Sequence, residues 1–187
     1  MRRLAGLTLA LLSVWALLVP GVAAAPPYTP ETLKALLPSQ ADLESATGLT
    51  FVATQDLNSS ADPVTVGRAF AVGNGTFVSV HLFSRADGAP PDAEQRKAIL
   101  DGTFLHDSLA TTFNANDRYE TLPALSRDGD DVGASFLSLV RGQTFSVIAD
   151  SFVRGNVYGI VIHARTSAND PATVRQTLNL LSSRLPR

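Results

Sequence analysis

The chain has 187 residues, of which 15 are Lys or Arg and 17 are Asp or Glu, and its formal net charge is −2. This mild acidity argues against nucleic-acid binding, which requires a basic face. The chain contains no cysteine, so disulfides, thiol catalysis and cysteine–zinc sites are excluded.

Residues 1–24 resemble a cleavable signal peptide of the Sec type. A pair of arginines precedes an uncharged apolar run over residues 4–19, and a Pro-Gly pair and small residues follow. This order is typical of an export signal, with cleavage expected after Ala24. An uncleaved membrane anchor is the alternative, but the run is shorter than the roughly 20 residues that a spanning helix needs. We therefore predict a secreted or periplasmic protein without stable membrane insertion, with residues 25–187 forming one domain.

Two short helices are expected at the start of this domain. Residues 29–31 combine a hydroxyl cap, a proline in the first turn and an acidic residue, which together favour a helix start. Ser39 with Asp42 three residues later indicates a second helix, for which Gly48 is the expected end.

A β-hairpin is the clearest local signal of the chain. Residues 64–72 and 76–84 are rich in β-branched and aromatic side chains and flank Asn74-Gly75, the pair that favours a tight type I′ turn. Both faces of the second strand carry apolar side chains, so a cover on each face is expected. Before this hairpin, a first strand is predicted over residues 49–54 and a polar loop over residues 58–63.

A longer helix is predicted from residue 89 to residue 113, followed by an antiparallel meander. Turn residues recur every ten to twelve residues between four expected strands, over 119–125, 132–140, 144–153 and 157–165. A final helix begins after Asp170-Pro171 and carries a leucine-rich stripe. This order predicts an α+β class fold, a mainly antiparallel sheet of about six to seven strands with helices packed on it.

The sequence contains no convergent catalytic motif. His106, Asp107 and Ser108 are the residue types of a hydrolase triad, but adjacent helical positions point in different directions. The acidic residues over 128–131 lack the ligands that a calcium loop needs at its fifth and twelfth positions. No catalytic residue, metal site or cofactor is therefore predicted.

Histidines and arginines on the strands are the candidate binding residues. If their strands are neighbours, His81 and His163 can share a face of the sheet, where Arg68 and Arg165 would join them. Such a cluster would hold an anion or a metal. The alternative is two half-exposed histidines with no common role. The site is expected on the face that the terminal helix leaves open.

A family resemblance lies mainly in the C-terminal half. Gly129-Asp130-Asp131 and the later Phe152-Val153-Arg154-Gly155-Asn156 resemble the "GDEA … FRRGN" rhythm of exported bacterial domains. Those domains are similar in layout to the fold of PsbP, the extrinsic subunit of photosystem II, and of a Ran-binding nuclear-transport factor. The resemblance implies a PsbP-like layered sandwich and a non-catalytic accessory or sensory domain outside the membrane, with no named substrate.

Three functions follow as hypotheses. The first is an exported, non-catalytic binding or accessory domain for an unknown protein or small-molecule ligand. The second is a metal-dependent or acid–base hydrolase outside the cytoplasm that uses His81, His163 and Asp150. The third is an accessory subunit of a cell-envelope complex.

Overall fold

The computed structural model describes residues 27–61, 63–101, 103, 104, 107, 118–122, 136–141, 145–165 and 171–185. The predictions for residues 1–24, for His106 and for the acidic turn over 128–131 fall outside the described residues.

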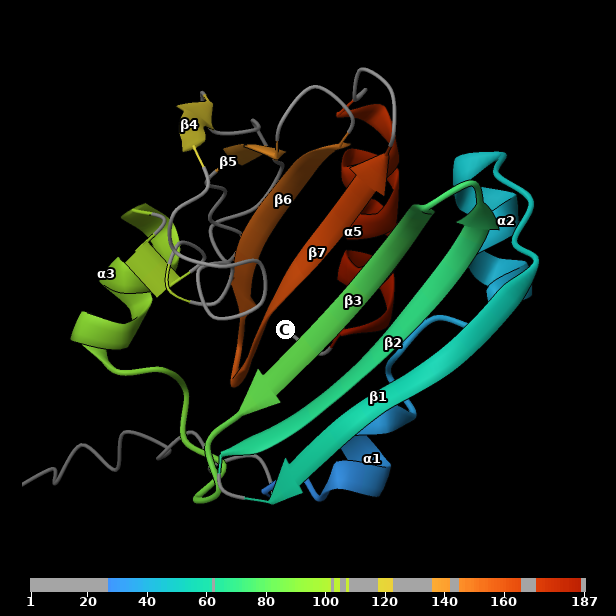
Figure 1. The fold of residues 1–187 in the computed structure, drawn as a ribbon. Coiled ribbons are helices and arrows are strands. Elements are labelled where there is room, and N and C mark those ends of the chain that lie inside the picture. The colour runs from blue at the N-terminus through green and yellow to red at the C-terminus, as the bar shows by residue number, and fades with distance from the viewer. Residues whose placement is uncertain are drawn as a thin grey trace, which may run out of the picture.

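Among the described residues, seven antiparallel strands form one sheet, in the order β1-β2-β3-β7-β6-β5-β4 (Figure 1). The strands are β1 Ala53–Ala61, β2 Val64–Gly73, β3 Thr76–Ser84, β4 Arg118–Leu122, β5 Phe136–Arg141, β6 Phe145–Arg154 and β7 Val157–Arg165. Two meanders, β1–β3 and β4–β7, join at the centre, where β3 pairs with β7. The predicted fold class and the predicted C-terminal meander are confirmed.

The β2–β3 hairpin turns as its sequence predicts. Gly73 pairs with Thr76, which leaves Asn74 and Gly75 as the two turn residues. Their φ angles are 53° and 74°, and positive φ at both positions is what a type I′ turn requires.

Four helices lie within the described residues: α1 Pro30–Lys34, α2 Gln40–Thr47, α3 Ala93–Asp101 and α5 Ala172–Arg184. A capping box starts α2, because the Ser39 side chain accepts a hydrogen bond from the Asp42 N–H and the Asp42 carboxylate accepts one from the Ser39 N–H. Gly48 ends α2 in the left-handed conformation, with φ 69°. The predicted starts of α1 and α2 and the predicted end of α2 are confirmed.

We predict that Gly48→Ala lowers the free energy of unfolding by about 1 kcal/mol, the cost of a left-handed conformation for a residue with a Cβ. No heavy atom lies within 4 Å of the position that this Cβ would take, so the loss reports backbone strain alone. Gly48→Asn should lose less, because asparagine tolerates this conformation better. Urea unfolding of both variants checks the prediction, and an unchanged Gly48→Ala protein would contradict it.

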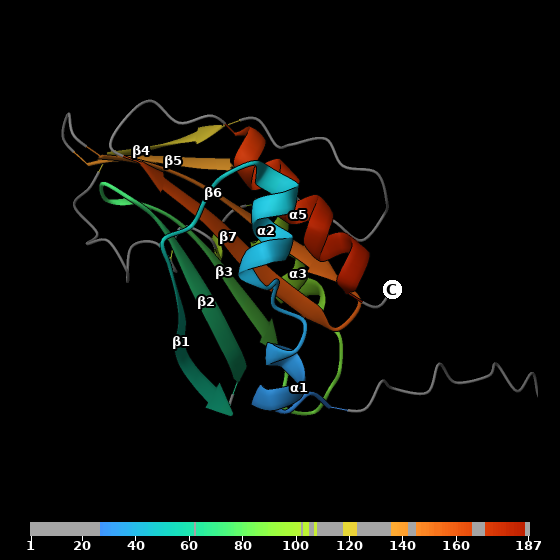
Figure 2. The same cartoon turned by 90° about the vertical axis from the view of Figure 1, so that its right-hand side faces the viewer.

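Helices cover both faces of the sheet, as the hairpin sequence predicts. Figure 2 shows α1, α2 and α5 on one side of the sheet, which we call the α5 face. Val80 and Leu82 of β3 belong there, in one cluster with Leu178 and Leu181 of α5. On the opposite side, the α3 face, Ile99 of α3 packs with side chains of β3, β6 and β7.

The first strand differs from its prediction. β1 begins at Ala53 and continues to Ala61, through most of the segment predicted as a polar loop. Its pairing with β2 shifts register between Leu57 and Ser60. β1 is an edge strand with mostly exposed side chains, so its position in the sheet, rather than apolar alternation, makes it a strand.

Candidate functional site

The strand register separates the two predicted site histidines. β3 and β7 are neighbours, as the prediction requires, but His163 pairs with Val78 and His81 pairs with Ile160. Directly opposed residues share a face, whereas successive residues alternate. His163 therefore lies on the α5 face with Val78, and His81 lies on the α3 face. The prediction that both share a face is wrong.

Arg68 ties the edge of the sheet to the segment between α1 and α2. It is opposite Val80 and so belongs to the α5 face. Its Nε donates to the Asp56 carboxylate at 2.7 Å, and its Nη1 donates to the Pro38 carbonyl at 2.9 Å. Lys34 Nζ lies 2.7 Å from the same carboxylate. These contacts give Arg68 a structural role.

The residues of the hydrolase hypothesis do not converge. Asp150 pairs with Val161 and is fully buried, and His163 is 1% exposed. Both lie on the α5 face, at diagonal positions of neighbouring strands, whereas His81 lies on the opposite face. Arg165, two positions after His163, is also on the α5 face. The structure thus brings together neither His81, His163 and Asp150 of the hydrolase hypothesis nor the four predicted binding residues.

His81 packs into the α3 face over a glycine of β2. Its Nε2 lies 3.3 Å from the Ser79 Oγ, and a Cβ at Gly67 would lie 3.1 Å from its Nδ1. Burial lowers the pKa of His81 below its ordinary value of 6.5, because the imidazolium is disfavoured away from water.

This lowered pKa predicts a loss of stability in mild acid. The unfolded chain binds the proton of His81 at a higher pH than the folded chain does, so the free energy of unfolding falls as the pH drops below 6.5. Above that pH His81 is neutral in both the folded and the unfolded chain, so its protonation takes nothing from the stability. We expect the free energy of unfolding, measured with urea, to fall from about pH 7.5 to about pH 5.5. This fall should be smaller for His81→Gln than for the wild type, because glutamine does not titrate. Equal losses would contradict the prediction.

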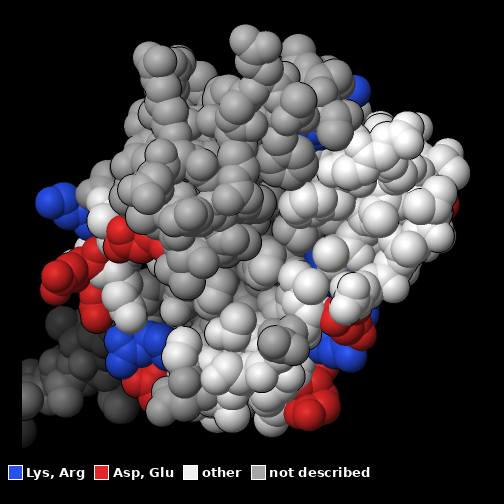
Figure 3. Space-filling model, viewed as in Figure 1, with Lys and Arg blue, Asp and Glu red and all other residues white. Residues whose placement is uncertain are grey.

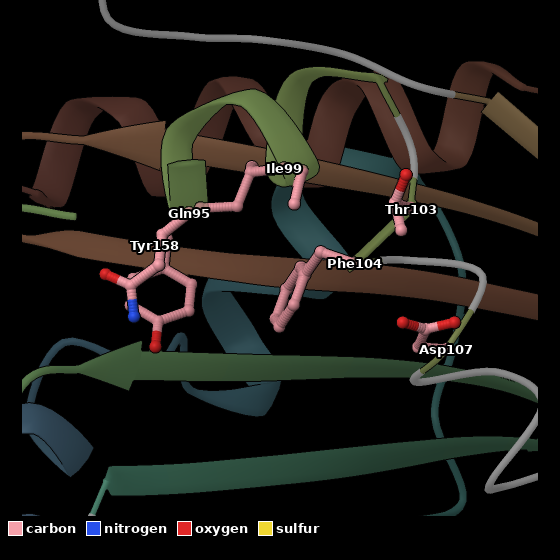
Figure 4. Close-up of a pocket in the computed structure, with 7 residues that line it drawn as sticks. Gln95, Ile99, Thr103, Phe104, Asp107 and Tyr158 are labelled. Atoms are coloured by element: carbon pink, nitrogen blue, oxygen red, sulfur yellow. The ribbon is translucent and has the colours of Figure 1, made fainter. Parts of the chain in front are cut away.

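A hollow of about 440 Å³ opens between α3 and the sheet. Its lining is mostly apolar and combines the helical segment after Asp92 with one residue of β7: Gln95, Ala98, Ile99, Thr103, Phe104, Asp107 and Tyr158 (Figure 4). It lies on the face that the terminal helix α5 leaves open, where the sequence predicted a site.

Three sets of hydrogen bonds hold α3 in place above this hollow. The Asp92 carboxylate accepts from the Gln95 N–H at 2.9 Å, and the Gln95 Oε1 accepts from the Asp92 N–H at 3.2 Å, which is a capping box. The buried Ser151 hydroxyl of β6 donates to the Ile99 carbonyl at 2.7 Å. The Asn156 amide, in the β6–β7 turn, donates to the Gly88 carbonyl at 3.2 Å. The helix and the segment before it are thus anchored to the sheet.

Two aromatic rings, Phe104 and Tyr158, line the hollow, and Phe83 packs against both of them. Tyr158 stacks on Phe83, with ring centroids 5.4 Å apart, and Phe104 meets both rings edge-on at 5.3 and 5.5 Å. Such arrangements stabilise aromatic pairs beyond their burial. Burial raises the pKa of Tyr158, so its hydroxyl stays neutral at physiological pH. The rings offer an apolar, uncharged surface.

A second, more polar hollow of about 490 Å³ adjoins the first and shares Gln95 and Tyr158 with it. Its charged lining is Arg85 and Asp87, joined by a two-pronged ion pair with N–O distances of 3.0 and 2.8 Å. Arg85 lowers the pKa of Asp87 to about 2. Arg85 also lies 3.6 Å from the Asp92 carboxylate. Figure 3 shows basic and acidic side chains together on the α3 side of the molecule.

The sequence did not single out this hollow as a site. Phe83, Ile99, Phe104 and Tyr158 lie on predicted elements that are far apart in the sequence, and no local pattern relates them to one another. The only available signal was that Phe83 and Tyr158 stand near the ends of predicted strands. Their stacking depends on the β3–β7 register, in which these two residues pair.

Within the described parts of the chain, no three His, Cys, Asp or Glu residues gather as metal ligands. None of the helices described is long and apolar enough to cross a membrane.

Comparison with known proteins gives a likeness of fold. No protein-family model matches the chain, and no curated protein matches it. Among solved structures, the chain is similar to the extracellular domain of PknH from Mycobacterium tuberculosis, with a TM-score of 0.52 and 12% sequence identity. The match covers 84% of this chain and 96% of that domain. At this identity the likeness concerns the fold alone.

Proposed function

We propose that this protein is an exported, non-catalytic binding domain whose small-molecule ligand occupies the hollow beneath α3. The observation that carries the proposal is the pair of aromatic rings, Phe104 and Tyr158, that line a hollow of about 440 Å³, with Phe83 packed against both rings. Ligand sites are commonly concave and apolar with few polar groups, and have volumes of roughly 300–1,000 Å³.

Two further observations support export. The N-terminal segment resembles a signal peptide, and the similar PknH domain is an extracellular one. The absence of cysteine means that such a domain would be held together outside the cell by its core and hydrogen bonds alone.

The hollow can be tested with a neutral fluorescent probe, N-phenyl-1-naphthylamine, on the purified domain. We expect saturable binding by the wild type. Ala98→Phe, which puts a ring into the hollow, should weaken binding about tenfold or more. Ala93→Phe makes the same change at an exposed position of α3 outside the lining, so it should bind as the wild type does. Absence of wild-type binding, or equal binding by Ala98→Phe with a native circular dichroism spectrum, would refute the proposed function.

A further inference from the structure

We infer that the ligand of the hollow beneath α3 is an uncharged molecule with an apolar body and a carbonyl oxygen, and that this oxygen accepts hydrogen bonds from Tyr158 and Gln95. The inference rests on the proposed function and adds the chemical class of the ligand. It is carried by two hydrogen-bond donors that line both hollows, and by the pairing of the charges around them.

The first donor is the Tyr158 hydroxyl. Tyr158 is 8% exposed, and among the described residues none forms a hydrogen bond with its hydroxyl. Burial raises the pKa of Tyr158, and the nearby positive charge of Arg85 opposes this rise. The hydroxyl is therefore protonated and lies toward the polar hollow, which Arg85 lines. A polar group in such a place gains from a hydrogen-bond partner, and a ligand with an acceptor would provide one.

The second donor is the side-chain amide of Gln95. Its Oε1 accepts from the Asp92 N–H at 3.2 Å, and because only the oxygen of an amide can accept, this bond fixes the orientation of the group. The Nε2 is left to donate elsewhere, and no described residue accepts from it. Figure 4 shows Gln95 and Tyr158 at one end of the apolar hollow, with Thr103 and Asp107 at the other. Both donors thus occur where the two hollows adjoin.

The charged groups that line the hollows already have partners. Arg85 donates through two nitrogens to the two carboxylate oxygens of Asp87, and the Asp87 carboxylate also accepts from the Ala89 N–H at 3.0 Å. Asp107 likewise interacts with another group of the chain. A charged ligand would have to break such a pair or bring an unpaired charge out of water, and both are unfavourable. An uncharged ligand meets neither cost.

A carbonyl oxygen joined to an apolar body matches this lining. The oxygen has two lone pairs and can accept from both donors, as it does in ketones, esters and amides. The apolar hollow continues over Ala98, Ile99 and Phe104, which offer contacts to hydrocarbon or to a ring. A site that is mostly apolar with a few placed polar groups uses those groups to orient its ligand.

Two neutral compounds of the same shape test the inference: butyrophenone, and 2-phenyl-1-pentene, in which a methylene group replaces the carbonyl oxygen. Each displaces N-phenyl-1-naphthylamine from the purified protein, and the ratio of their affinities is compared between variants. Tyr158→Phe keeps the ring and should weaken butyrophenone about three- to tenfold relative to 2-phenyl-1-pentene. Gln95→Glu keeps an oxygen for the Asp92 N–H but removes the amide donor, and should lower the same ratio about threefold or more.

Tyr28→Phe is the matched control, because it removes a tyrosine hydroxyl that belongs to the α5 face and lies outside the lining. Its affinity ratio should equal that of the wild type. The anionic compound 4-phenylbutyrate should bind more weakly than butyrophenone, since its carboxylate would compete with Asp87 for Arg85.

The outcomes separate the two proposals. A ratio that falls in Tyr158→Phe and Gln95→Glu but not in Tyr28→Phe supports the inference. An unchanged ratio in Tyr158→Phe or in Gln95→Glu, tighter binding of 4-phenylbutyrate than of butyrophenone, or failure of butyrophenone to displace the fluorescent probe would overturn it and leave the proposed function intact. Failure of the fluorescent probe itself to bind would overturn both.

Discussion

Gly159→Ala is expected to cost about 3 kcal/mol or more of the free energy of unfolding. A Cβ at this position of β7 would lie 2.4 Å from the His81 carbonyl oxygen and 2.8 Å from the Phe152 ring. The first of these atoms is backbone of the neighbouring strand β3, so relief requires the central strand pair to move apart. Urea unfolding followed by far-ultraviolet circular dichroism measures the loss.

Gly67→Ala is the matched control, because Gly67 also lies within a strand of the same sheet. Its Cβ would approach side-chain atoms only, at 3.1 to 3.3 Å from His81 and Leu57. These side chains can shift by a few tenths of an ångström, so we expect a loss below about 1.5 kcal/mol. Losses of the same size in both variants would show that backbone contact does not decide the effect.

Phe70→Ala is expected to cost about 3–5 kcal/mol. Phe70 is fully buried in the cluster on the α5 face, and its ring lies 5.4 Å from that of Phe51, which follows α2. Removal of the ring leaves a cavity between sheet and helices. Thermal unfolding should show a fall of the midpoint on the order of 10 °C.

Two further variants serve as controls for Phe70→Ala. Phe70→Leu keeps much of the volume and should lose less than Phe70→Ala. Val52→Ala changes a neighbouring apolar residue that is 71% exposed, so its stability should stay within about 0.5 kcal/mol of the wild type. A Phe70→Ala protein as stable as Val52→Ala would contradict the placement of Phe70 in the core.

The sequence was most informative where structure is determined locally. The Asn74-Gly75 turn and the Ser39 cap depend on residues within a few positions of each other, and both were predicted correctly. The edge strand β1 was placed too early, because its polar residues become a strand through pairing with β2. The PsbP-like resemblance concerned turns and strand ends, and it stays a prediction.

The candidate site was harder to predict because it depends on register. Both histidine-bearing strands were predicted with the bounds that the structure shows. A change of one residue in the offset between them, however, reverses which face of the sheet a side chain occupies. The same offset brings Phe83 opposite Tyr158 and so stacks their rings. The periodicity of a single strand predicts neither the faces on which His81 and His163 lie nor the pairing of Phe83 with Tyr158.

The central β3–β7 pairing sets the order in which this chain can fold. Phe77 of β3 pairs with Ala164 of β7, so the two halves of the sheet join only through residues far apart in the sequence. The first hairpin can form early, but its face stays open until nearly the whole polypeptide is available. Such long-range closure is slow. If the chain crosses a membrane from its N-terminus, the core closes only after the last strand emerges, and the β2–β3 hairpin is the part that would need protection from aggregation during transit.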